Sequence, residues 1–510
     1  MDYLTLNDLG LAKSIALAAL LIYGVSALRA IKLIPRKRAL PLPPGPPGLP
    51  IIGNILDVPR EEFWWKYKEW SDQYGSDVIY LNLLGHDVIV LNSLGACKEL
   101  LERRSSIYSS RPDMPMLNDF IGFDWHFAFM PYGDEWKERR KLFMQAFGAN
   151  KVDKFRPQLL RHVRNFIVSL LDDPEGFRDH ARLYNGRGVY SSYGLEVRSF
   201  KDPYIIQVER GMDAMAKAGT AASYMVDFLP SLKILPSWFP GGQFKRDANA
   251  WRPYVEGMAR EPFKFVEEAL KRGDARPCVA TEFLQDLSES DPEYEDKRKL
   301  VHDVLAAVYA AGSDTTVSTV TTFLLAMSQN PAIQERAQAV VDEALPYVDA
   351  IVREVLRWKP VAPVGVAHTV IQDDVYNGYH IPKGAQLIPN CYVVTHDPAV
   401  YGSNTKIFDP SRFLDSTQTE IKKDAPLGLE AFGFGRRVCP GMEIAIESVW
   451  LVVVSVLAVF DISKAEGEQE GFGEYTSGLI IHPHPFKINI VPRSKEAEAL
   501  IRSSVITSGL

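Results

Sequence analysis

One cysteine of this 510-residue chain lies where a thiol could bind a metal. Cys439 closes the run FGFGRRVC, and a proline and a glycine follow it before a long apolar stretch begins. The other cysteines, Cys97, Cys278 and Cys391, are far from it and from one another, and no C-x-x-C pair occurs. This spacing argues against a zinc site and against a disulfide framework, so we expect reduced cysteines.

The residues around Cys439 predict the start of a helix beside its sulfur. Pro440 suits the first turn, where a backbone N–H is not needed, and the apolar run MEIAIESVWLVVVSVLAVF continues the helix. Unpaired N–H groups and the positive end of the helix dipole would then lie near the thiol. Gly433 and Gly435 would let the preceding chain turn tightly around it. These features lower the pKa of a thiol, so the sequence predicts a thiolate.

A thiolate with no other cysteine or histidine nearby cannot complete a zinc site. It can be the single protein ligand of a metal whose other ligands belong to a cofactor, and haem is such a cofactor. A buried, inert cysteine is the alternative. That reading explains neither the glycines before Cys439 nor the adjacent Arg436 and Arg437.

Residues 432–441 resemble the haem-binding signature of cytochromes P450, F-x-x-G-x-R-x-C-x-G. The matching positions are Phe432, Gly435, Arg437, Cys439 and Gly441. Cytochromes P450 are the standard case of a haem held by a cysteine thiolate. The resemblance implies haem b, with Cys439 as the axial ligand of its iron and the other matching residues around the cofactor.

A second chemical group lies in a helical stretch from about residue 299 to 327, which reads AGSDTT from Ala311 on. The hydroxyl of Thr315 can donate back to the carbonyl of Ala311 and loosen the helix, and Gly312 leaves space beside it. The stretch resembles the oxygen-binding groove of P450s. That resemblance implies that Asp314 and Thr315 form the acid–alcohol pair that delivers protons during oxygen activation. Simple packing in a buried helix is the alternative for Thr315.

Further residues match positions that hold the haem propionates in P450s. Trp136 and Arg140 in WKERR have the family spacing W-x-x-x-R, and Arg437 belongs to the signature. His368 lies where the family often has a propionate partner. An ordinary hydrogen-bonded loop histidine is the alternative for His368.

Glu354 and Arg357 lie three residues apart and share one face of a predicted helix. Alone, such a pair is most simply an exposed ion pair of little energetic weight. Together with Arg412 in the downstream run FDPSRF, the pair resembles the P450 motif E-x-x-R. The resemblance implies a buried network of these three side chains that supports folding behind the haem.

The N-terminal residues predict a membrane anchor with a helix over about residues 9–28. Lys13 is the one charged residue in that span, and about 20 residues are enough to cross a bilayer. Five Lys or Arg residues follow in residues 29–38, which places the C-terminal side in the cytoplasm. A cleaved secretory signal is the alternative, but its positive residues would come first and no A-x-A site follows.

The remaining chain predicts a single large domain. We expect the anchor in residues 1–35, a stiff proline-rich linker in 36–54 and one haem domain in 55–510. Helical periodicity dominates from residue 94 to 358, and short strand-like runs occur at 76–92, at 366–389 and after 475. The expected fold is mainly α with small β-sheets, a cytochrome P450 fold preceded by a single transmembrane helix.

Two aromatic-rich segments, residues 114–130 and 224–244, predict the wall and the lid of an apolar pocket. Core packing or, for the second segment, contact with the membrane is the alternative. The connection between the helix that begins near Pro331 and the E-x-x-R helix is shorter than is usual in the family. Such a connection could impair folding or partner docking, or it could reflect a gene-model error.

The resemblance extends to about residue 492 and is closest to fungal microsomal P450s. It implies a monooxygenase of the endoplasmic reticulum membrane that inserts one oxygen atom from O2 into an apolar small molecule. Electrons would come from NADPH through a separate P450 reductase, because the chain has no room for a flavin domain. Lys137, Arg139, Lys141 and Arg436 are expected on the cysteine side of the haem as its docking site, with ordinary solvated charge as the alternative.

The substrate class follows only loosely from the sequence. A fungal secondary metabolite such as a terpenoid or polyketide is expected, with broad oxidation of foreign compounds as the alternative. A haem-thiolate isomerase, dehydratase or peroxygenase, or an inactive haem scaffold, are further alternatives, and the intact Asp314–Thr315 pair favours a monooxygenase. The net charge of -7 argues against nucleic acid as a partner.

Overall fold

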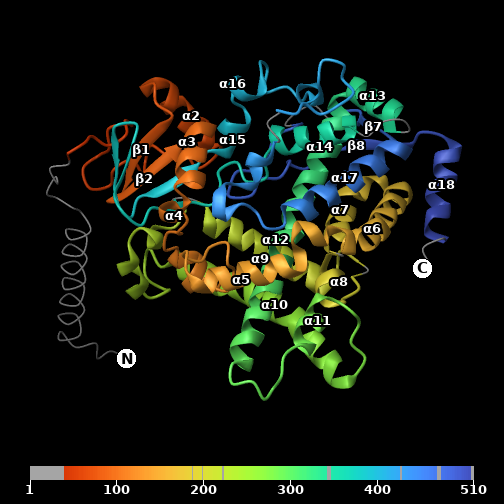
Figure 1. Cartoon of the computed structure of the whole chain (residues 1–510), viewed down its shortest axis with the longest axis horizontal. Coiled ribbons are helices and arrows are strands. Elements are labelled where there is room, and N and C mark those ends of the chain that lie inside the picture. The colour runs from red at the N-terminus through yellow and green to blue at the C-terminus, as the bar shows by residue number, and fades with distance from the viewer. Residues whose placement is uncertain are drawn as a thin grey trace, which may run out of the picture.

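The computed structural model describes residues 39–506 except 187, 198, 221–222, 342–345, 425–427 and 468–471. Helices dominate it, and they surround one long helix, α12 (Tyr294–Gln329), which runs through the centre of the molecule (Figure 1). α12 is apolar on most sides, and such a helix is stable only when other elements cover it. It is therefore the element around which the site is built, as the sequence predicts.

The helices that contact α12 come from both sides of it in the sequence. They are α5 (Asp134–Phe147), α7 (Phe177–Gly186), α8 (Gly188–Tyr193), α9 (Pro203–Gly219), α10 (Gln243–Arg272), α11 (Val279–Gln285), α13 (Pro331–Val341), α14 (Pro346–Trp358) and α17 (Met442–Val459). Other helices pack outside this layer or connect it to the sheets: α2 (Phe63–Tyr74), α3 (Leu94–Cys97), α4 (Ser105–Tyr108), α6 (Val152–Asp172), α15 (Cys391–Thr395), α16 (Pro398–Tyr401) and α18 (Lys495–Ile506).

The main sheet lies at one side of the helical body and has the strand order β1-β2-β6-β3 (Figure 1). Its strands are β1 (Val78–Leu83), β2 (His86–Leu91), β3 (His368–Thr369) and β6 (Gln386–Pro389). β1 and β2 come from the predicted strand-like run at 76–92 and pair in antiparallel, whereas β2 pairs in parallel with β6 from a much later part of the chain. Two smaller antiparallel sheets are made by β4 (Asp374–Tyr376) with β5 (Tyr379–Ile381) and by β7 (Phe460–Lys464) with β8 (Ile488–Pro492).

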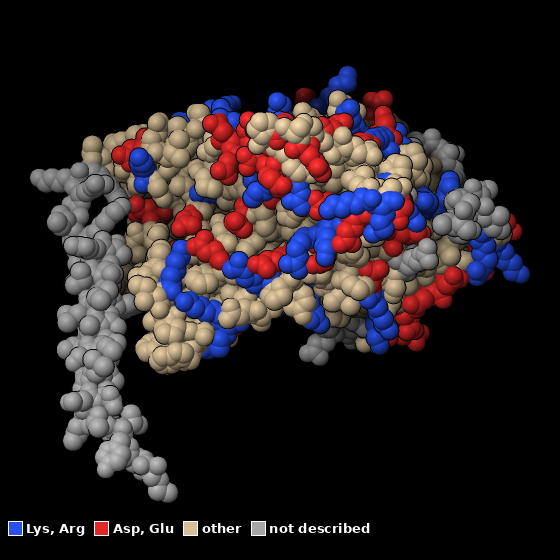
Figure 2. All heavy atoms as spheres, turned by 90° about the horizontal axis from the view of Figure 1, so that it is seen from below, with Lys and Arg blue, Asp and Glu red and all other residues tan. Residues whose placement is uncertain are grey.

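The prediction of a mainly helical domain with small sheets is confirmed. One boundary differs, because the apolar run predicted as helix ends at Val459 and Phe460 begins β7. The two helices that the short connection joins, α13 and α14, are both formed. On the face that carries α10 and α11, positive and negative side chains are intermixed (Figure 2).

The described part of the predicted linker lies against the sheet. The carbonyl of Pro44 accepts a hydrogen bond from the N–H of Tyr80 (2.9 Å), and that of Pro41 accepts one from His380 (2.7 Å). A Cβ atom at Gly45 would lie 1.9 Å from the carbonyl oxygen of Tyr80, so this approach requires glycine. The proline-rich segment is thus bonded to the body from about residue 41 on.

The predicted anchor helix, residues 9–28, lies outside the described residues. Among the described helices, α17 is the one that is long and apolar enough to cross a membrane by length and composition. It packs against α6, α12 and α14 inside a core cluster. Apolar composition in α17 is therefore accounted for by its place in the core.

Candidate active site

The loop before α17 turns tightly around Cys439. Gly433 and Gly435 both have positive φ, 84° and 56°, which favours glycine. A Cβ atom at Gly435 would lie 2.1 Å from the carbonyl oxygen of Leu101, so a side chain there would displace backbone. The N–H of Cys439 donates to Phe432 (2.8 Å), which closes the loop. The predicted turn and the helix that follows it are confirmed.

The pKa of the Cys439 thiol differs from the prediction. Burial raises it above its ordinary value, and the N–H of Gly441 and the guanidinium of Arg140 act in the opposite direction. The prediction of a lowered pKa from nearby backbone dipoles is therefore wrong in its net sign, because desolvation of the thiol outweighs them. A thiolate at this position needs the additional positive charge of a bound metal ion, which deprotonates a coordinating thiol outright.

Arg437 leaves the same loop and enters the protein interior. Its guanidinium donates to the carbonyls of Ser109 (2.7 Å), Met130 (2.7 Å) and Phe127 (3.2 Å). It also stacks on Trp136 of α5, with 4.4 Å between the guanidinium carbon and the ring centroid. Burial lowers the pKa of Arg437 to about 9, with the charge of nearby Arg140 as a further cause. The structure thus brings the signature loop and the W-x-x-x-R helix together, as predicted.

Arg140 and His368 also lie at this place. Arg140 donates to the carbonyl of Val438 (2.7 Å), and Nδ1 of His368 bonds to the carbonyl of Tyr108 (2.7 Å). Since a carbonyl only accepts, Nδ1 of His368 carries the proton. Burial, and then Arg111, lower the pKa of His368, so the ring is neutral and its Nε2 is an acceptor. His368 can therefore donate to a propionate only after gaining a second proton.

Arg111 was not identified from the sequence. Its buried guanidinium donates to the carbonyls of Ala128 (2.9 Å), Val366 (2.8 Å) and Ala367 (2.9 Å). Burial lowers the pKa of Arg111, and repulsion from Arg437 adds to this effect. An arginine before a proline in a short loop carries no local signal of such a role, since its partners lie far along the chain.

Arg111 and Arg437 form no ion pair with any carboxylate in the described part of the chain. Two buried guanidinium groups that repel one another are costly unless an anion joins them. The two propionates of haem carry that negative charge, and charge-assisted bonds to guanidinium suit them. Together with the thiol of Cys439, these side chains fit haem.

α12 is opened at one place along its length. Residues 311–315 are partly or fully exposed, whereas most residues of the adjoining stretches, 301–310 and 316–328, are buried. The hydroxyl of Thr315 donates to the carbonyl of Ala311 (2.9 Å), as predicted. No atom lies within 4 Å of a Cβ built at Gly312, so the predicted space beside it is present. Asp314 bonds to His482 (Oδ2 to Nε2, 3.1 Å), a partner that the sequence did not indicate.

The E-x-x-R pair is fully buried. Arg357 bonds to both oxygens of Glu354 at 2.6 and 2.7 Å, and Arg412 reaches them at 3.1 Å. The N–H of Asp409 and the carbonyl of Thr395 complete the network, at 2.7 and 3.0 Å. The predicted structural network is confirmed, and the alternative of an exposed pair is excluded.

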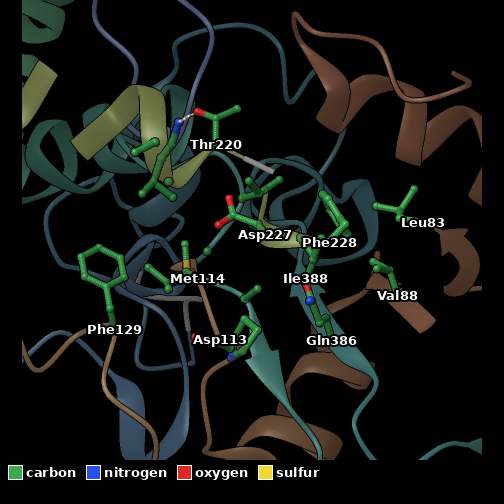
Figure 3. A pocket seen from close by; sticks show the side chains of 18 of the residues that line it. Leu83, Val88, Asp113, Met114, Phe129, Thr220, Asp227, Phe228, Gln386 and Ile388 are labelled. Atoms are coloured by element: carbon green, nitrogen blue, oxygen red, sulfur yellow. Dashed lines mark hydrogen bonds between the residues drawn. The ribbon is translucent and has the colours of Figure 1, made fainter. Parts of the chain in front are cut away.

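A largely apolar pocket lies between the main sheet and the loops that follow α4 and α9 (Figure 3). The predicted wall contributes Met114 and Phe129, and the predicted lid contributes Asp227 and Phe228. Val366 also lines it and accepts a hydrogen bond from Arg111, so the pocket borders the cationic side chains at its inner wall. Each segment thus contributes some residues to the pocket, whereas Phe123, Trp125 and Phe127 lie in a core cluster, as the alternative of core packing expected.

Asp227 is the unusual group in this pocket. Its Oδ1 accepts a hydrogen bond from the N–H of Met116 (2.8 Å). Burial, with Asp113 and Asp119 nearby, raises the pKa of Asp227 to about 7. The carboxyl group therefore holds its proton to a much higher pH than an ordinary aspartate does.

The structure exposes some of the expected docking residues and buries one of them. Lys137, Lys141 and Arg436 are exposed. Arg139 is buried and bonds to the buried carboxylate of Asp303 (2.8 Å), so its expected place on the docking surface is wrong. Arg139 joins α5 to α12, because its buried guanidinium pairs with a buried carboxylate on that helix.

The fold and the site fit a class of protein in which Cys439, with Arg111 and Arg437 nearby, would hold a haem, and in which one long central helix is opened at residues 311–315. The family model for cytochrome P450 matches residues 43–490. A cytochrome P450 monooxygenase of Armillaria gallica is 39% identical over 92% of this chain and 95% of its own length. A tryptamine 4-monooxygenase of Psilocybe cyanescens is 34% identical, over 90% of this chain and 95% of its own.

The chain belongs to the cytochrome P450 family, and its relatives show it to be a monooxygenase. A further relative, a cytochrome P450 monooxygenase of Rhodocybe pseudopiperita, is 38% identical over 92% of this chain and 93% of its own length. Family membership implies haem with a cysteine thiolate ligand, dioxygen as oxidant and a redox partner.

Proposed function

We propose that this protein inserts one oxygen atom from O2 into an apolar small molecule of fungal secondary metabolism. Electrons come from NADPH through a separate P450 reductase, and the cofactor is haem b with Cys439 as axial ligand. The observation that carries the proposal is the opening of α12 at residues 311–315, where Asp314 and Thr315 lie beside free space. Haem, when bound, supplies the reductive activation of O2.

The side chains at the opening have separate roles. The Thr315 hydroxyl donates to the carbonyl of Ala311, so its lone pairs remain available to accept a hydrogen bond from a water in the groove. Asp314 is 27% exposed and bonds to a His482 ring that is 30% exposed. A carboxylate in this position can exchange protons with solvent and pass them to that water. Proton delivery of this kind supports oxygen insertion over isomerase, dehydratase or peroxygenase chemistry.

The pocket supports a small, mainly apolar substrate. Met114, Phe129, Phe228 and Leu479 provide aromatic and aliphatic contacts, and such a lining binds apolar molecules through buried area. One relative is named for the oxidation of tryptamine, a small aromatic amine. A selective enzyme of secondary metabolism, making terpenoids or polyketides, is our proposal, and broad oxidation of foreign polycyclic compounds is the alternative.

The test uses the full chain in membranes with haem, a P450 reductase and NADPH. The reduced carbon monoxide difference spectrum should first show the red-shifted band of a thiolate-ligated haem. Incubation with terpenoids, polyketides and foreign polycyclic compounds under isotopically labelled O2 should then give one product with one labelled oxygen. The Cys439→Ser protein in the same membranes is the control. Turnover of many polycyclic compounds would overturn selectivity, and unlabelled products would overturn oxygen insertion.

We also propose that residues 9–28 anchor the protein in the endoplasmic reticulum membrane, with the haem domain in the cytoplasm. Exposed apolar side chains on the body support this arrangement, since Leu56, Ile234 and Trp238 are each more than 70% exposed. Deletion of residues 1–35 should make the protein extractable by carbonate. If the deleted protein partitions between membrane and soluble fractions as the full chain does, the anchor is elsewhere.

The docking of the reductase is proposed on the face that carries Lys137, Lys141 and Arg436. Lys137 bonds to Asp134 (2.8 Å), and Arg436 bonds to the hydroxyl of Tyr132 (2.7 Å), so both are held in place while exposed. Exposed positive charge near the thiolate side attracts an acidic partner and raises the association rate.

A further inference from the structure

A loop near the C-terminus, residues 475–482, is fastened to one face of α12. Its bonds are Tyr475 Oη to Thr322 Oγ1 (3.0 Å), Ser318 Oγ to the carbonyl of Ile481 (2.6 Å) and His482 Nε2 to Asp314 Oδ2 (3.1 Å). The three α12 side chains follow one another at intervals of four residues, so they form one row along the helix. These three hydrogen bonds therefore fix the loop 475–482 against this row of side chains on α12.

The backbone on both sides of His482 is fixed. The N–H of Thr476 donates to the carbonyl of His482 (2.8 Å), and the N–H of His482 donates to the hydroxyl of Thr476 (2.9 Å). The N–H of Ile481 donates to the carbonyl of Val361 (2.9 Å). Because its backbone is held at both ends of the loop, the imidazole of His482 is presented to Asp314 in a defined direction.

The tip of the same loop belongs to the substrate pocket. Leu479 lines the pocket, and its N–H donates to the hydroxyl of Thr220 (3.2 Å), which lines it too. Figure 3 shows this hydrogen bond at the edge of the pocket. Leu479 is three residues from His482, so one short, closed loop touches both the pocket and the carboxylate of Asp314.

Asp314 lies near another acidic side chain, so its hydrogen bond to His482 affects which rotamer its carboxylate adopts. Glu209 of α9 is a neighbouring acid, and Asp314 is one of the charges that raise the pKa of Glu209, after burial as the main cause. Arg182 forms an ion pair with Glu209 (Nε to Oε1, 2.9 Å). Among the described side chains, His482 is the one that forms a hydrogen bond with Asp314. Without it, repulsion from Glu209 favours other rotamers of Asp314.

We propose that His482 is a positioning residue for Asp314. It holds the carboxylate in the orientation that serves proton delivery beside Thr315, and its loop joins that placement to the wall of the substrate pocket. This inference rests on the proposed oxygen insertion. It adds a residue to the proton path that lies 168 positions from Asp314 in the sequence.

The test compares His482→Leu with His482→Gln in the full, haem-loaded chain. Leucine cannot bond to Asp314, whereas the glutamine amide can still donate to it. We expect His482→Leu to lower the product formed per NADPH by about tenfold and to release the difference as peroxide. This is less than the ~10²–10⁴-fold of direct acid–base catalysis, because His482 acts through Asp314. His482→Gln should retain most of the product yield, because its amide can still donate a hydrogen bond to the carboxylate of Asp314.

His484→Leu is the matched control. His484 is an exposed histidine two residues further on, and in the described part of the chain no hydrogen bond or ion pair joins its side chain to Asp314. Its loss should leave the yield unchanged. Substrate affinity, measured by the spectral shift on binding, should be the same in all four proteins. A fully coupled His482→Leu protein, or equal losses in the leucine and glutamine variants, would overturn the positioning role.

Thermal unfolding provides a second measurement that does not use activity. The losses in Tm from Asp314→Leu and from His482→Leu should overlap in the double variant, because each substitution removes the same bond. Additive losses would show that the two side chains do not interact and would overturn the inference. If the wild-type protein yields no oxygenated product while the losses overlap, the proposed function fails and the contact stands.

Discussion

Replacing Glu354 by glutamine should destabilise the haem domain far more than any exposed substitution. Glu354 and Arg357 are 0% exposed, and the carboxylate accepts two bonds from Arg357, two from Arg412 and one from the N–H of Asp409. Glutamine keeps the shape but removes the negative charge and directs an NH2 group at guanidinium. Removing one partner of a buried ion pair costs about 3–5 kcal/mol. Since two arginines lose their partner here, we expect about 5 kcal/mol.

That loss is large compared with the stability of a typical domain, about 5–15 kcal/mol. The assay is urea unfolding of the haem-loaded protein together with the ratio of haem to protein after purification. Glu335→Gln on the exposed face of α13 is the matched control, with an expected change of about 0.5 kcal/mol or less. Adding Arg357→Met to Glu354→Gln should recover part of the loss, because one uncompensated charge is removed. A Glu354→Gln protein with full haem content and a loss below about 1 kcal/mol would refute the reasoning.

Four further predictions concern chemistry, reduction and pH. Cys439→Ser should abolish the thiolate band in the carbon monoxide difference spectrum, because a hydroxyl does not donate charge to iron as sulfur does; an unchanged band would contradict the ligand assignment. Thr315→Val should bind substrate normally and lower the product per NADPH by about 10²-fold, with peroxide released instead; full yield would make Thr315 a packing residue. Lys137→Glu with Lys141→Glu should slow reduction at low ionic strength, with the difference lost at high salt; equal rates at both would remove the docking site. Asp227→Asn should raise the free energy of unfolding above about pH 7 by ~1–2 kcal/mol and have little effect below about pH 4. The reason is that burial raises the pKa of Asp227 to about 7, so ionisation of its carboxyl group destabilises the fold as the pH rises. Equal effects in both pH ranges in unfolding experiments would contradict that last prediction.

The parts of the site that the sequence predicts are those governed by near neighbours in the chain. Gly433 and Gly435 take the positive φ angles that the tight turn requires, and the N–H of Cys439 closes the turn within eight residues. The bond from Thr315 to the carbonyl four residues before it was predicted for the same reason. Backbone dihedrals and i–4 contacts depend on local sterics, so they can be derived from a short stretch of sequence.

The parts that the sequence does not predict depend on contacts between distant segments. Arg111 acquires its role from Val366, 255 positions away, and His482 meets Asp314 across 168. Arg139 reads as a surface charge in the run WKERR, and only its approach to Asp303 on another helix buries it.

By itself, the amino-acid sequence determined the thiolate loop, the hydroxyl–carbonyl bond in the central helix, the E-x-x-R pair and the family. Tertiary structure alone decided which charges are desolvated. The pKa of the Cys439 thiol shows the difference: local dipoles act to lower it, but burial by surrounding segments raises it. Desolvation depends on every element that packs over a side chain. The sequence therefore identifies the ionisable groups, but only the tertiary structure determines which of them are removed from water.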